Sequence, residues 1–367
     1  MAEIFRCTYS NENCGDIPKE KQALLVEYGK SIPEGYGLYL FQSIDDRMPT
    51  TKNSFLIPAG TRAGSFIRKT ANTISLEFTS DIPDRSLFLT RKCNSNCIMC
   101  PYSEKFRSGK DEVEFSSLIK YIELMSTNTD YICITGGEPT LRKEEFFDVL
   151  ELIKHRLRFA IVHILTNGRT FCYSDFLERY RQVRPYSTLL GIPLHAASPE
   201  LHDSITQSKG SFDETIAALG QLLKFNEKIE LRIVTSALNR DDLPNIAKYI
   251  AKHFPNVYTV CFMGLEMMGN SMINRNKVWC NYDSLWPYIR EATEILISNA
   301  IPVQLYNYPL CAIEEKYHPL YRKSITANKV VYKDECAVCE KKDECGGFFR
   351  TTIHMEDISV KPYFKEF

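Results

Sequence analysis

Three cysteines lie close together in the segment CNSNCIMC. Cys93, Cys97 and Cys100 are separated by three and then by two residues. Thiolates are soft ligands that suit iron–sulfur sites, so one short loop can hold three irons of a [4Fe–4S] cluster. The remaining iron would lack a protein ligand and would be open to another molecule. Because chance also produces this spacing, its context in the chain decides how it is interpreted.

From about residue 86 the chain alternates between strand-like and helix-like segments. Apolar runs of strand length occur at 86–90, 131–135, 159–166, 188–194, 229–235 and 258–263. Helix-like segments occur at 116–125, 143–155, 174–183, 212–225, 242–253 and 283–298. Most strand-like runs are nearly continuous in Ile, Val and Leu, which is typical of parallel strands buried on both faces. This alternation predicts an α/β fold, an incomplete (βα)6 barrel of the TIM type.

The predicted barrel places the cysteine run where chemistry gathers, at the carboxyl ends of the strands. The second strand ends in Thr135-Gly136-Gly137-Glu138-Pro139-Thr140. Two glycines allow a ligand to approach the backbone closely, and Glu138 can accept a hydrogen bond from an amine. In isolation this motif indicates a glycine turn into the next helix. Its position beside the cysteine loop favours a binding site.

Later strands bring further polar residues to the same rim. The third strand ends in Thr166-Asn167-Gly168, and the fourth ends near His195. A lone histidine is more often a structural residue than a ligand. Arg232 lies inside the fifth strand, where a buried charge needs a partner. That partner is a substrate carboxylate, Glu138 or Glu230.

Composition excludes several classes of partner. The 367-residue chain is 44% hydrophobic and 25% charged, with a net charge of −1 and a pI of about 6.7. We expect no nucleic-acid or membrane partner, because the chain lacks a basic field and an apolar stretch long enough to span a bilayer. The start carries no secretory signal, so we expect a cytoplasmic protein. Thiols stay reduced there, and the odd count of 13 cysteines agrees with metal ligation rather than complete pairing.

Together, Cys-x3-Cys-x2-Cys after strand one, GGEP after strand two and TNG after strand three resemble the radical S-adenosylmethionine superfamily. The resemblance covers about residues 84–300. It implies that the open iron binds the amino and carboxylate groups of S-adenosylmethionine. One electron, from a flavodoxin- or ferredoxin-type donor, then breaks the sulfonium C–S bond. The resulting 5′-deoxyadenosyl radical abstracts hydrogen from an unactivated carbon of the substrate.

The resemblance also implies site residues. Cys93, Cys97 and Cys100 hold the catalytic cluster, and the Gly-Gly-Glu-Pro turn contacts the methionyl amine. The implied cofactor-binding residues are Met99, Tyr102, Gly136, Gly137, Glu138, Pro139, Asn167, His195, Arg232, Met263 and Gly264. One position departs from the family pattern. The family usually has an aromatic residue where this chain has Met99, and we expect Tyr102 to cover the adenine instead.

A second set of cysteines lies near the end of the chain. Cys311, Cys336, Cys339 and Cys345 form the pattern Cys-x24-Cys-x2-Cys-x5-Cys. Four thiolates suit an auxiliary [4Fe–4S] cluster or a structural zinc site. Radical enzymes that modify peptides often carry such an extension, so the resemblance favours iron–sulfur over zinc.

The layout predicts three domains and a subfamily. We expect a small β-rich or mixed domain at 1–83, the barrel at 84–300 and an auxiliary-cluster extension at 301–367. This layout, with a tail ending in Cys-x2-Cys-x5-Cys-Gly-Gly, resembles the C component of the His-Xaa-Ser system. That resemblance implies modification of a ribosomally made precursor peptide, alongside a second radical enzyme and a small partner protein. The N-terminal domain is the expected docking site for the peptide or a partner.

Two other functions are consistent with the same residues. A radical enzyme of cofactor biosynthesis would act on a small molecule. A zinc-stabilised binding module would use the cysteines without catalysis and would be colourless.

Overall fold

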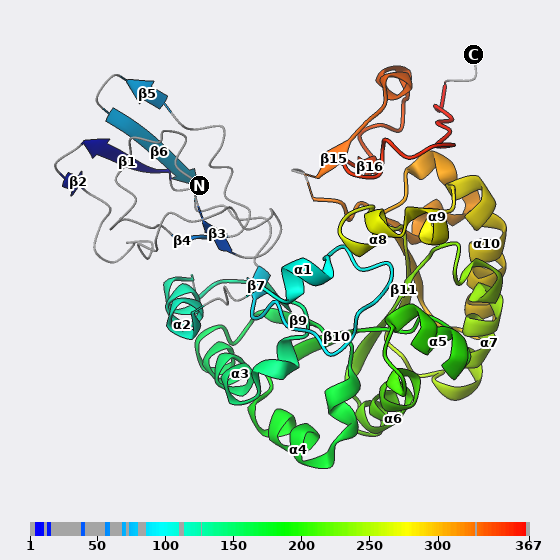
Figure 1. The fold of residues 1–367 in the computed structure, drawn as a ribbon, viewed down its shortest axis with the longest axis horizontal. Coiled ribbons are helices and arrows are strands. Elements are labelled where there is room, and N and C mark those ends of the chain that lie inside the picture. Colours follow the sequence, from blue (N-terminus) through cyan, green and yellow to red (C-terminus); the bar gives the residue numbers. More distant parts are fainter. Residues whose placement is uncertain are drawn as a thin grey trace. The chain divides into compact units, whose positions relative to one another are not determined.

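The structure is a computed structural model, and its strands and helices are shown in Figure 1. It describes residues 86–364 apart from 110–113, 126 and 327–328, together with six short strands before residue 80. The chain divides into two compact units. Unit 1 comprises residues 1–90, 111–163 and 183–187, and unit 2 comprises residues 91–110, 164–182 and 188–367.

The described N-terminal segments are all strands. A four-stranded antiparallel sheet has the order β2-β1-β6-β5, and β3 pairs with β4 in a separate antiparallel ribbon. Their bounds are β1 Ile4–Ser10, β2 Asn13–Gly15, β3 Leu38–Leu40, β4 Leu56–Pro58, β5 Arg68–Thr70 and β6 Thr73–Thr79. They lie in the part of the chain for which a small β-rich or mixed domain is predicted, and that domain stays a prediction. The predicted boundary at residue 83 stays a prediction.

The following strands form one eight-stranded sheet with the order β14-β13-β12-β11-β10-β9-β8-β7. The bounds are β7 Ser86–Phe88, β8 Tyr131–Thr135, β9 Ile161–Leu165, β10 Ser187–Pro193, β11 Lys228–Val234, β12 Thr259–Met263, β13 Val303–Tyr306 and β14 Tyr321–Arg322. The registered pairs β7–β8, β10–β11, β11–β12, β12–β13 and β13–β14 are parallel. The predicted parallel α/β fold is therefore confirmed. β13 and β14 extend the sheet beyond the six predicted strands. These two strands were not predicted, because such short runs give little sequence signal.

The six helix-like segments are helices: α2 Phe115–Leu124, α3 Glu144–Arg156, α4 Ser174–Val183, α6 Ser211–Lys224, α7 Leu243–His253 and α10 Tyr282–Ser298. Four shorter helices were not predicted: α1 Glu104–Arg107, α5 Pro199–Thr206, α8 Asn270–Ile273 and α9 Arg275–Val278. α5 begins with a capping hydroxyl, since Ser198 accepts from the backbone N–H of Leu201, and proline occupies its first turn.

Alternation along β11 shows how unit 2 places polar side chains. Ile229, Leu231 and Ile233 are fully buried on one face of this strand. Glu230 and Arg232 occupy the opposite face, since successive side chains of a strand point to opposite sides. Figure 1 shows α5, α6, α7 and α10 flanking the strands of unit 2. The strand thus packs apolar side chains on one face and leaves a charged pair on the other.

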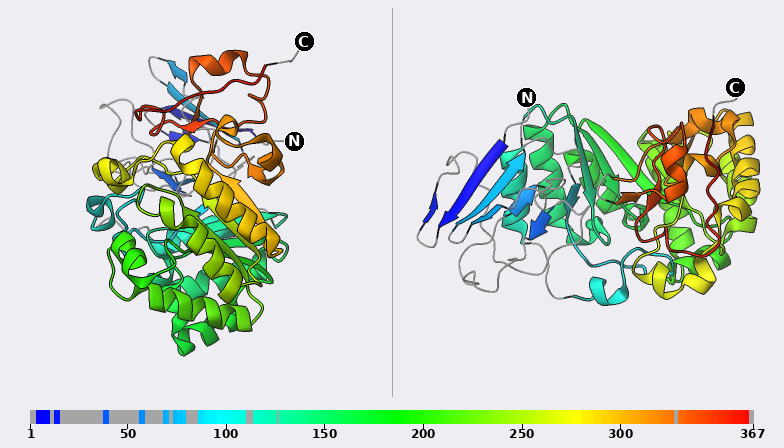
Figure 2. Two further views of the ribbon diagram at one scale, coloured as in Figure 1. Left: turned by 90° about the vertical axis from the view of Figure 1, so that its right-hand side faces the viewer. Right: turned by 90° about the horizontal axis from the view of Figure 1, so that it is seen from above.

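After β13 the chain forms an irregular segment that packs beside α10 (Figure 2, orange to red). It contains η6 Leu310–Ala312, η7 Glu315–Leu320 and η8 Asp334–Val338. It also contains an antiparallel pair formed by β15 Val330–Val331 and β16 Phe348–Phe349. Asp283 at the start of α10 accepts from Ser359 at 2.7 Å and pairs with Lys361 at 2.6 Å. These contacts attach the second cysteine region to the helix.

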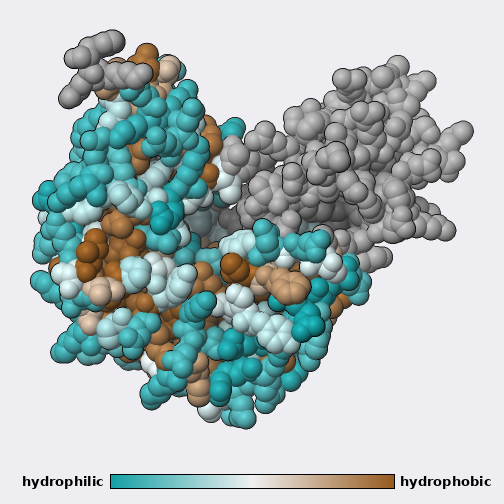
Figure 3. All heavy atoms as spheres, turned by 180° about the vertical axis from the view of Figure 1, so that it is seen from behind, coloured by the Kyte–Doolittle hydropathy of each residue, from teal (hydrophilic) through white to brown (hydrophobic). Residues whose placement is uncertain are grey.

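Polar side chains cover much of the surface seen in Figure 3, with hydrophobic side chains gathered in a few places. The exposed large hydrophobic residues of the chain include Phe159, Tyr186 and Ile273. Within the described part of the chain, no helix combines the length and apolar character needed to cross a bilayer.

Candidate active site

The cysteine loop of residues 93–100 follows β7 and precedes α1. Cys93, Cys97 and Cys100 are half-buried thiols. The loop has a defined backbone, because the N–H of Cys100 donates to the carbonyl of Cys97 at 3.1 Å. In addition, the N–H groups of Asn96 and Ile98 each donate at 2.9 Å to a carbonyl at the end of α5. The loop is therefore shaped by protein hydrogen bonds.

Backbone N–H groups also face two of the three sulfur atoms. The N–H of Ser95 lies 3.4 Å from the sulfur of Cys93, and that of Tyr102 lies 3.4 Å from the sulfur of Cys100. Such hydrogen bonds stabilise thiolate charge and tune the potential of iron–sulfur clusters. The loop presents the sulfur atoms in a setting that suits metal-bound thiolates.

Burial makes the thiols of Cys97 and Cys100 hard to ionise without a metal. It raises the pKa of Cys97 far above the ordinary value, and the neighbouring Cys100 and Cys93 raise that pKa further. Burial also raises the pKa of Cys100 to about 11, while the positive charge of Arg107 acts in the opposite direction. A bound cation supplies the charge that ionises such thiols.

The predicted rim residue Asn167 contacts the cysteine loop. Its side-chain amide donates to the side-chain oxygen of Asn94 at 2.6 Å. The next arginine, Arg169, begins η4 (Arg169–Cys172) and donates to the carbonyl of Asn94 at 2.7 Å and the hydroxyl of Ser95 at 3.0 Å. The turn after the third strand therefore holds the cysteine loop, as its predicted place at the same rim implies.

In unit 1, the glycine turn after β8 packs tightly against the end of β7. A Cβ atom on Gly136, where φ is +155°, would lie 2.6 Å from the carbonyl oxygen of Thr90, so only glycine fits. The N–H of Gly137 donates to that same oxygen at 2.7 Å. Glu138 is fully buried and caps η3 (Pro139–Arg142), accepting from the N–H and hydroxyl of Thr140 at 3.1 and 2.7 Å. The turn is rigid and carries a buried carboxylate.

His195 is buried beside a second histidine. The His195 and His202 rings lie 5.4 Å apart, and the backbone N–H of His195 donates to Nδ1 of His202 at 3.3 Å. Burial, reinforced by the nearby His202, lowers the pKa of His195 to about 3. The imidazole is therefore neutral at physiological pH. Its predicted contact with the cofactor stays a prediction.

Arg232 finds one of its three predicted partners within its own strand. Its guanidinium forms an ion pair with Glu230, whose side chain is only 4% exposed. The two residues lie on the same face of β11, where this pair offsets the cost of burying a carboxylate. The register of the sheet places Cys261 directly beside Arg232. The pairing with Glu230 accounts for a charged residue inside this strand.

The remaining predicted cofactor residues are mostly buried. Met99 packs in a core cluster with Ile205, Leu265, Met267 and Val278, as well as partly buried neighbours. Tyr102 is 8% exposed and its ring stacks on Phe106 at 4.7 Å. The predictions that Met99 and Tyr102 serve the cofactor remain untested by these contacts.

Met263 and Gly264 lie where β12 ends. Met263 is buried, and the N–H of Gly264 donates to the carbonyl of Tyr306 at 2.8 Å. A Cβ atom on Gly264 would lie 2.3 Å from the carbonyl oxygen of Asn307. The backbone here is thus closely packed against the segment after β13.

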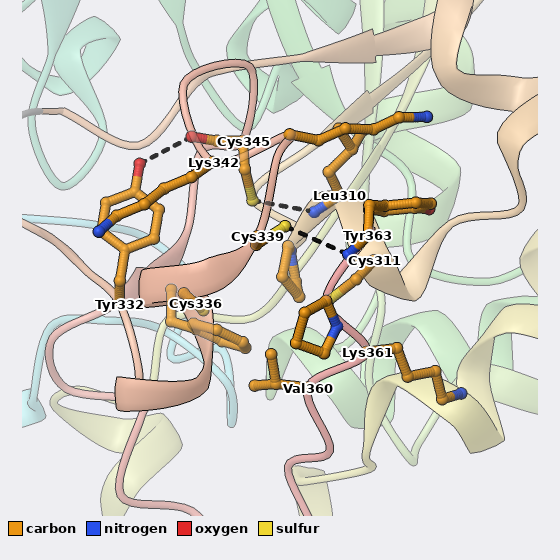
Figure 4. Close-up of a pocket in the computed structure, with 14 residues that line it drawn as sticks. Leu310, Cys311, Tyr332, Cys336, Cys339, Lys342, Cys345, Val360, Lys361 and Tyr363 are labelled. Carbon is orange, nitrogen blue, oxygen red and sulfur yellow. Dashed lines mark hydrogen bonds between the residues drawn. The ribbon is translucent and has the colours of Figure 1, made fainter. Parts of the chain in front are cut away.

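The second cysteine set lines one pocket of about 330 Å³, part of it open to solvent. Cys311, Cys336, Cys339 and Cys345 all belong to its wall. In Figure 4 the sulfur atoms of Cys339 and Cys345 point toward its middle. Burial raises the pKa of Cys336, and the charges of Cys345 and Cys339 raise it further. The fold therefore brings Cys311 into one pocket with three cysteines that lie more than twenty positions later in the sequence.

Three backbone N–H groups point at sulfur atoms in this pocket. Cys345 receives them from Leu310 at 3.2 Å and Gly347 at 3.3 Å, and Cys339 receives one from Tyr363 at 3.4 Å. Tyr332 donates to the carbonyl of Cys345 at 2.8 Å (Figure 4). The donors match those expected around metal-bound thiolates.

Both cysteine sets fit iron–sulfur clusters in donor type and in surroundings. Among the residues that the structure describes, no group of three or more His, Cys, Asp or Glu side chains is arranged so that it could hold a metal ion. The fit therefore rests on sulfur donors gathered on one loop or in one pocket, with backbone N–H groups facing them.

Sequence reasoning missed several residues that hold the cysteine loop. The additional contacts come from Arg107, Arg169, Asn270, Ser271 and Asn274. Arg169 directly follows the TNG turn, and Asn270 and Asn274 are four residues apart, which is the spacing of one helical turn. These positions gave only a weak indication in the sequence that the three residues act near the site. Their contacts to residues far away in sequence were not readable from local pattern.

Comparison with known proteins identifies the barrel segment. Residues 87–260 match the profile of the Radical SAM superfamily. The Fe-coproporphyrin III synthase of Methanosarcina barkeri is 23% identical over 224 residues, which are 60% of this chain and 52% of the relative. The Bacillus subtilis antilisterial bacteriocin subtilosin biosynthesis protein AlbA is 28% identical over 174 residues, or 46% of this chain and 36% of the relative.

A third curated relative is the GTP 3′,8-cyclase of Shewanella denitrificans, 25% identical over 179 residues, or 46% of this chain and 49% of the relative. The chain spans about half the length, or less, of these curated relatives. Among solved structures, that of Streptococcus suis SuiB bound to precursor peptide SuiA aligns with a TM-score of 0.47 at 12% identity, covering 60% of this chain and 47% of SuiB. The profile match and the parallel α/β sheet identify residues 87–260 as a Radical SAM superfamily domain.

Proposed function

We propose that this protein is a radical S-adenosylmethionine enzyme that modifies a ribosomally made peptide. The observation that carries the proposal is the loop of Cys93, Cys97 and Cys100, three half-buried thiols inside a Radical SAM domain. Three protein ligands leave one iron of a cubane open for the cosubstrate. When bound, the cluster supplies the electron that cleaves S-adenosylmethionine and starts hydrogen abstraction.

The chain's own residues would hold and orient the cosubstrate. The Gly136–Gly137 turn and Glu138 receive the methionyl amine, because a rigid turn with a buried carboxylate suits an ammonium group. Pro139 begins η3 directly after that carboxylate and helps to keep the turn fixed. Asn167 orients the cysteine loop through Asn94. A radical also needs a site that excludes water, which the packed rim favours.

The later rim residues are proposed to contact the rest of the cosubstrate. His195 would offer a neutral imidazole, and Arg232 a guanidinium already paired with Glu230. The backbone at Met263 and Gly264 would face the adenine, with Tyr102 against the base. These assignments follow from position at the ends of β10, β11 and β12.

An auxiliary [4Fe–4S] cluster is proposed for Cys311, Cys336, Cys339 and Cys345. Four thiols in one pocket and three backbone N–H groups on sulfur support it over a surface thiol set. The cluster would bind or oxidise the substrate, or relay an electron. Zinc is the alternative occupant, because its tetrahedral thiolate sites use the same ligands.

The peptide substrate is the finer part of the proposal. A cysteine-rich C-terminal segment is typical of peptide-modifying radical enzymes, and AlbA, a relative, is named for bacteriocin biosynthesis. A precursor rich in His-Xaa-Ser repeats is the proposed substrate. The partners would be a second radical enzyme, a small accessory protein and an electron donor of the flavodoxin or ferredoxin type.

A second candidate function is radical chemistry on a small molecule. Two relatives favour it by name, an Fe-coproporphyrin III synthase and a GTP 3′,8-cyclase. In this alternative the second cysteine set would serve a metabolite instead of a peptide. A non-catalytic, zinc-stabilised module is a weaker third candidate.

Anaerobic purification tests the reaction class. We expect a brown protein with roughly eight irons and eight sulfides, because each cubane holds four of each. After chemical reduction, S-adenosylmethionine should yield 5′-deoxyadenosine. Cys97→Ala should abolish that product, while Cys172→Ala, a matched change at a half-buried free thiol outside both sets, should preserve it. Intact clusters without 5′-deoxyadenosine in the unaltered protein would refute the proposal.

The substrate class needs a separate assay. The reduced protein is incubated with a synthetic peptide of His-Xaa-Ser repeats, and the peptide mass is followed with that of 5′-deoxyadenosine. A mass change that requires Cys97 supports the peptide substrate. Turnover of a porphyrin or nucleotide with no change in any peptide would favour the small-molecule alternative.

A further inference from the structure

The segment 269–274, which contains α8, lies directly against the cysteine loop. The side-chain amide of Asn270 donates to the carbonyl of Cys97 at 3.1 Å and to the side-chain oxygen of Asn96 at 3.1 Å. Its own side-chain oxygen accepts from the N–H of Glu104 at 3.2 Å. Asn270 itself is only 8% exposed, and the three bonds are partly buried. One asparagine therefore joins the loop to the start of α1.

Two neighbours of Asn270 bind the next carbonyls of the loop. Asn274 donates to the carbonyl of Ile98 at 3.2 Å, and the backbone N–H of Ser271 donates to the carbonyl of Cys100 at 3.2 Å. Three carbonyls, those of Cys97, Ile98 and Cys100, thus accept from a single short segment. Because these peptide groups surround two cysteines, the segment sets the direction in which their side chains leave the backbone.

The segment is itself anchored, so it can act as a rigid support. The hydroxyl of Ser271 donates to the carbonyl of Glu266 at 2.6 Å and accepts from the N–H of Met268 at 2.8 Å. Thr352, fully buried, accepts from the N–H of Met267 at 3.0 Å. Glu266 forms an ion pair with Lys329 at 3.2 Å. These bonds tie the segment to the region that carries the second cysteine set.

We infer that Asn270 is a positioning residue for the radical cluster, supported by Asn274. Their bonds shape the loop of Cys93–Cys100 before any metal binds, so the places of its sulfur atoms would be set in advance for the cluster. The inference rests on the proposed function for its catalytic part, whereas the shape of the metal-free loop is independent of it. Small misplacements of reacting atoms lower the reaction rate by large factors, so a support that fixes the loop should increase the rate of S-adenosylmethionine cleavage.

Hydrogen exchange of the metal-free protein tests the shape of the loop. The N–H groups of Asn96, Ile98 and Cys100 are bonded in the structure, so they should exchange slowly without iron. Asn270→Asp keeps an acceptor for Glu104 but replaces the amide donor with a carboxylate oxygen. We expect loop exchange to rise roughly tenfold in this variant. Asn245→Asp, an exposed asparagine that bonds only near α7, is the matched control and should leave the loop unchanged.

Spectroscopy and kinetics of the reconstituted protein test the positioning role. All three cysteine ligands remain in Asn270→Asp, so we expect the cluster to assemble. The change in the EPR spectrum on adding S-adenosylmethionine should be altered, and the rate of 5′-deoxyadenosine formation should fall tenfold to a hundredfold. Asn274→Ala removes the side-chain bonds to the carbonyls of Ile98 and Asn270 but keeps the amide of Asn270 on the loop. It should produce a smaller change of the same kind and serves if the first variant does not fold.

The outcomes separate this inference from the proposed function. An unprotected loop in the metal-free protein, or loop exchange and spectra in Asn270→Asp equal to those of the unaltered protein, would overturn the inference. If the unaltered protein forms no cluster or cleaves no S-adenosylmethionine, the proposed function fails. The exchange measurement would still decide whether Asn270 shapes the loop.

Discussion

Replacing Gly269 by alanine is the sharpest test of the packing between the cysteine loop and the segment 269–274. Gly269 has φ +60° and ψ −126°, a conformation that costs an L-residue about 1–3 kcal/mol. An alanine Cβ would also lie 2.3 Å from the carbonyl oxygen of Pro101. Backbone cannot yield as a flexible side chain does, so this overlap adds about 1–3 kcal/mol. We expect Gly269→Ala to lower the free energy of unfolding by about 4 kcal/mol.

Two other glycines separate the steric cost from the conformational cost. Gly210 has φ +80° but no atom lies within 4 Å of a Cβ placed there, so Gly210→Ala should cost only about 1–2 kcal/mol. Gly220 lies inside α6 with open space around it, and Gly220→Ala should stabilise by about 0.5–1 kcal/mol. The three variants form a graded series in which only the first disturbs the cysteine loop.

Urea unfolding of the metal-free variants, followed by circular dichroism, measures these differences. Iron content after reconstitution and dialysis against a chelator reports on the loop itself, and only Gly269→Ala should lose iron faster. The packing argument is wrong if Gly269→Ala destabilises no more than Gly210→Ala does. It is also wrong if all three variants retain iron equally.

Three further predictions concern buried polar groups. The pKa values of His195 and His202 are lowered to about 3 and about 4. As the pH falls, both histidines therefore take up protons in the unfolded chain at a higher pH than in the folded protein. The stabilisation that comes from keeping both imidazoles neutral is fully present above pH 6.5 and is lost as the pH falls, and the loss reaches about 3 kcal/mol at pH 5.5. Replacing both histidines by glutamine should flatten this pH dependence of the free energy of unfolding. Arg232→Met removes the guanidinium that forms an ion pair with the buried carboxylate of Glu230 and should lower the free energy of unfolding in urea by about 3 kcal/mol, with recovery when Glu230→Gln is added. Thr352→Val removes the acceptor for Met267 and should lower the melting temperature by a few degrees, equivalent to about 1–3 kcal/mol; an unchanged melting temperature would argue against a buried bond there.

The local sequence pattern was sufficient to predict those elements whose own residues carry a strong hydrophobic pattern. The continuous apolar runs predicted the parallel strands, since both faces of such a sheet are buried and the signal is strong. The short strands β13 and β14 and the short helices α5 and α8 were missed. Each is held by contacts to distant residues rather than by its own periodicity.

By itself the sequence determined which residues can do chemistry. The spacing of Cys93, Cys97 and Cys100, the glycine–glutamate turn and the later cysteine pattern all follow from covalent order. Tertiary structure decided how those residues are held. It brought Cys311 into one pocket with cysteines more than twenty positions away, and it assigned Glu230 as the partner of Arg232. It also placed Asn270 against the cysteine loop, because hydrogen bonds across long sequence separations depend on the packed fold and leave no local pattern.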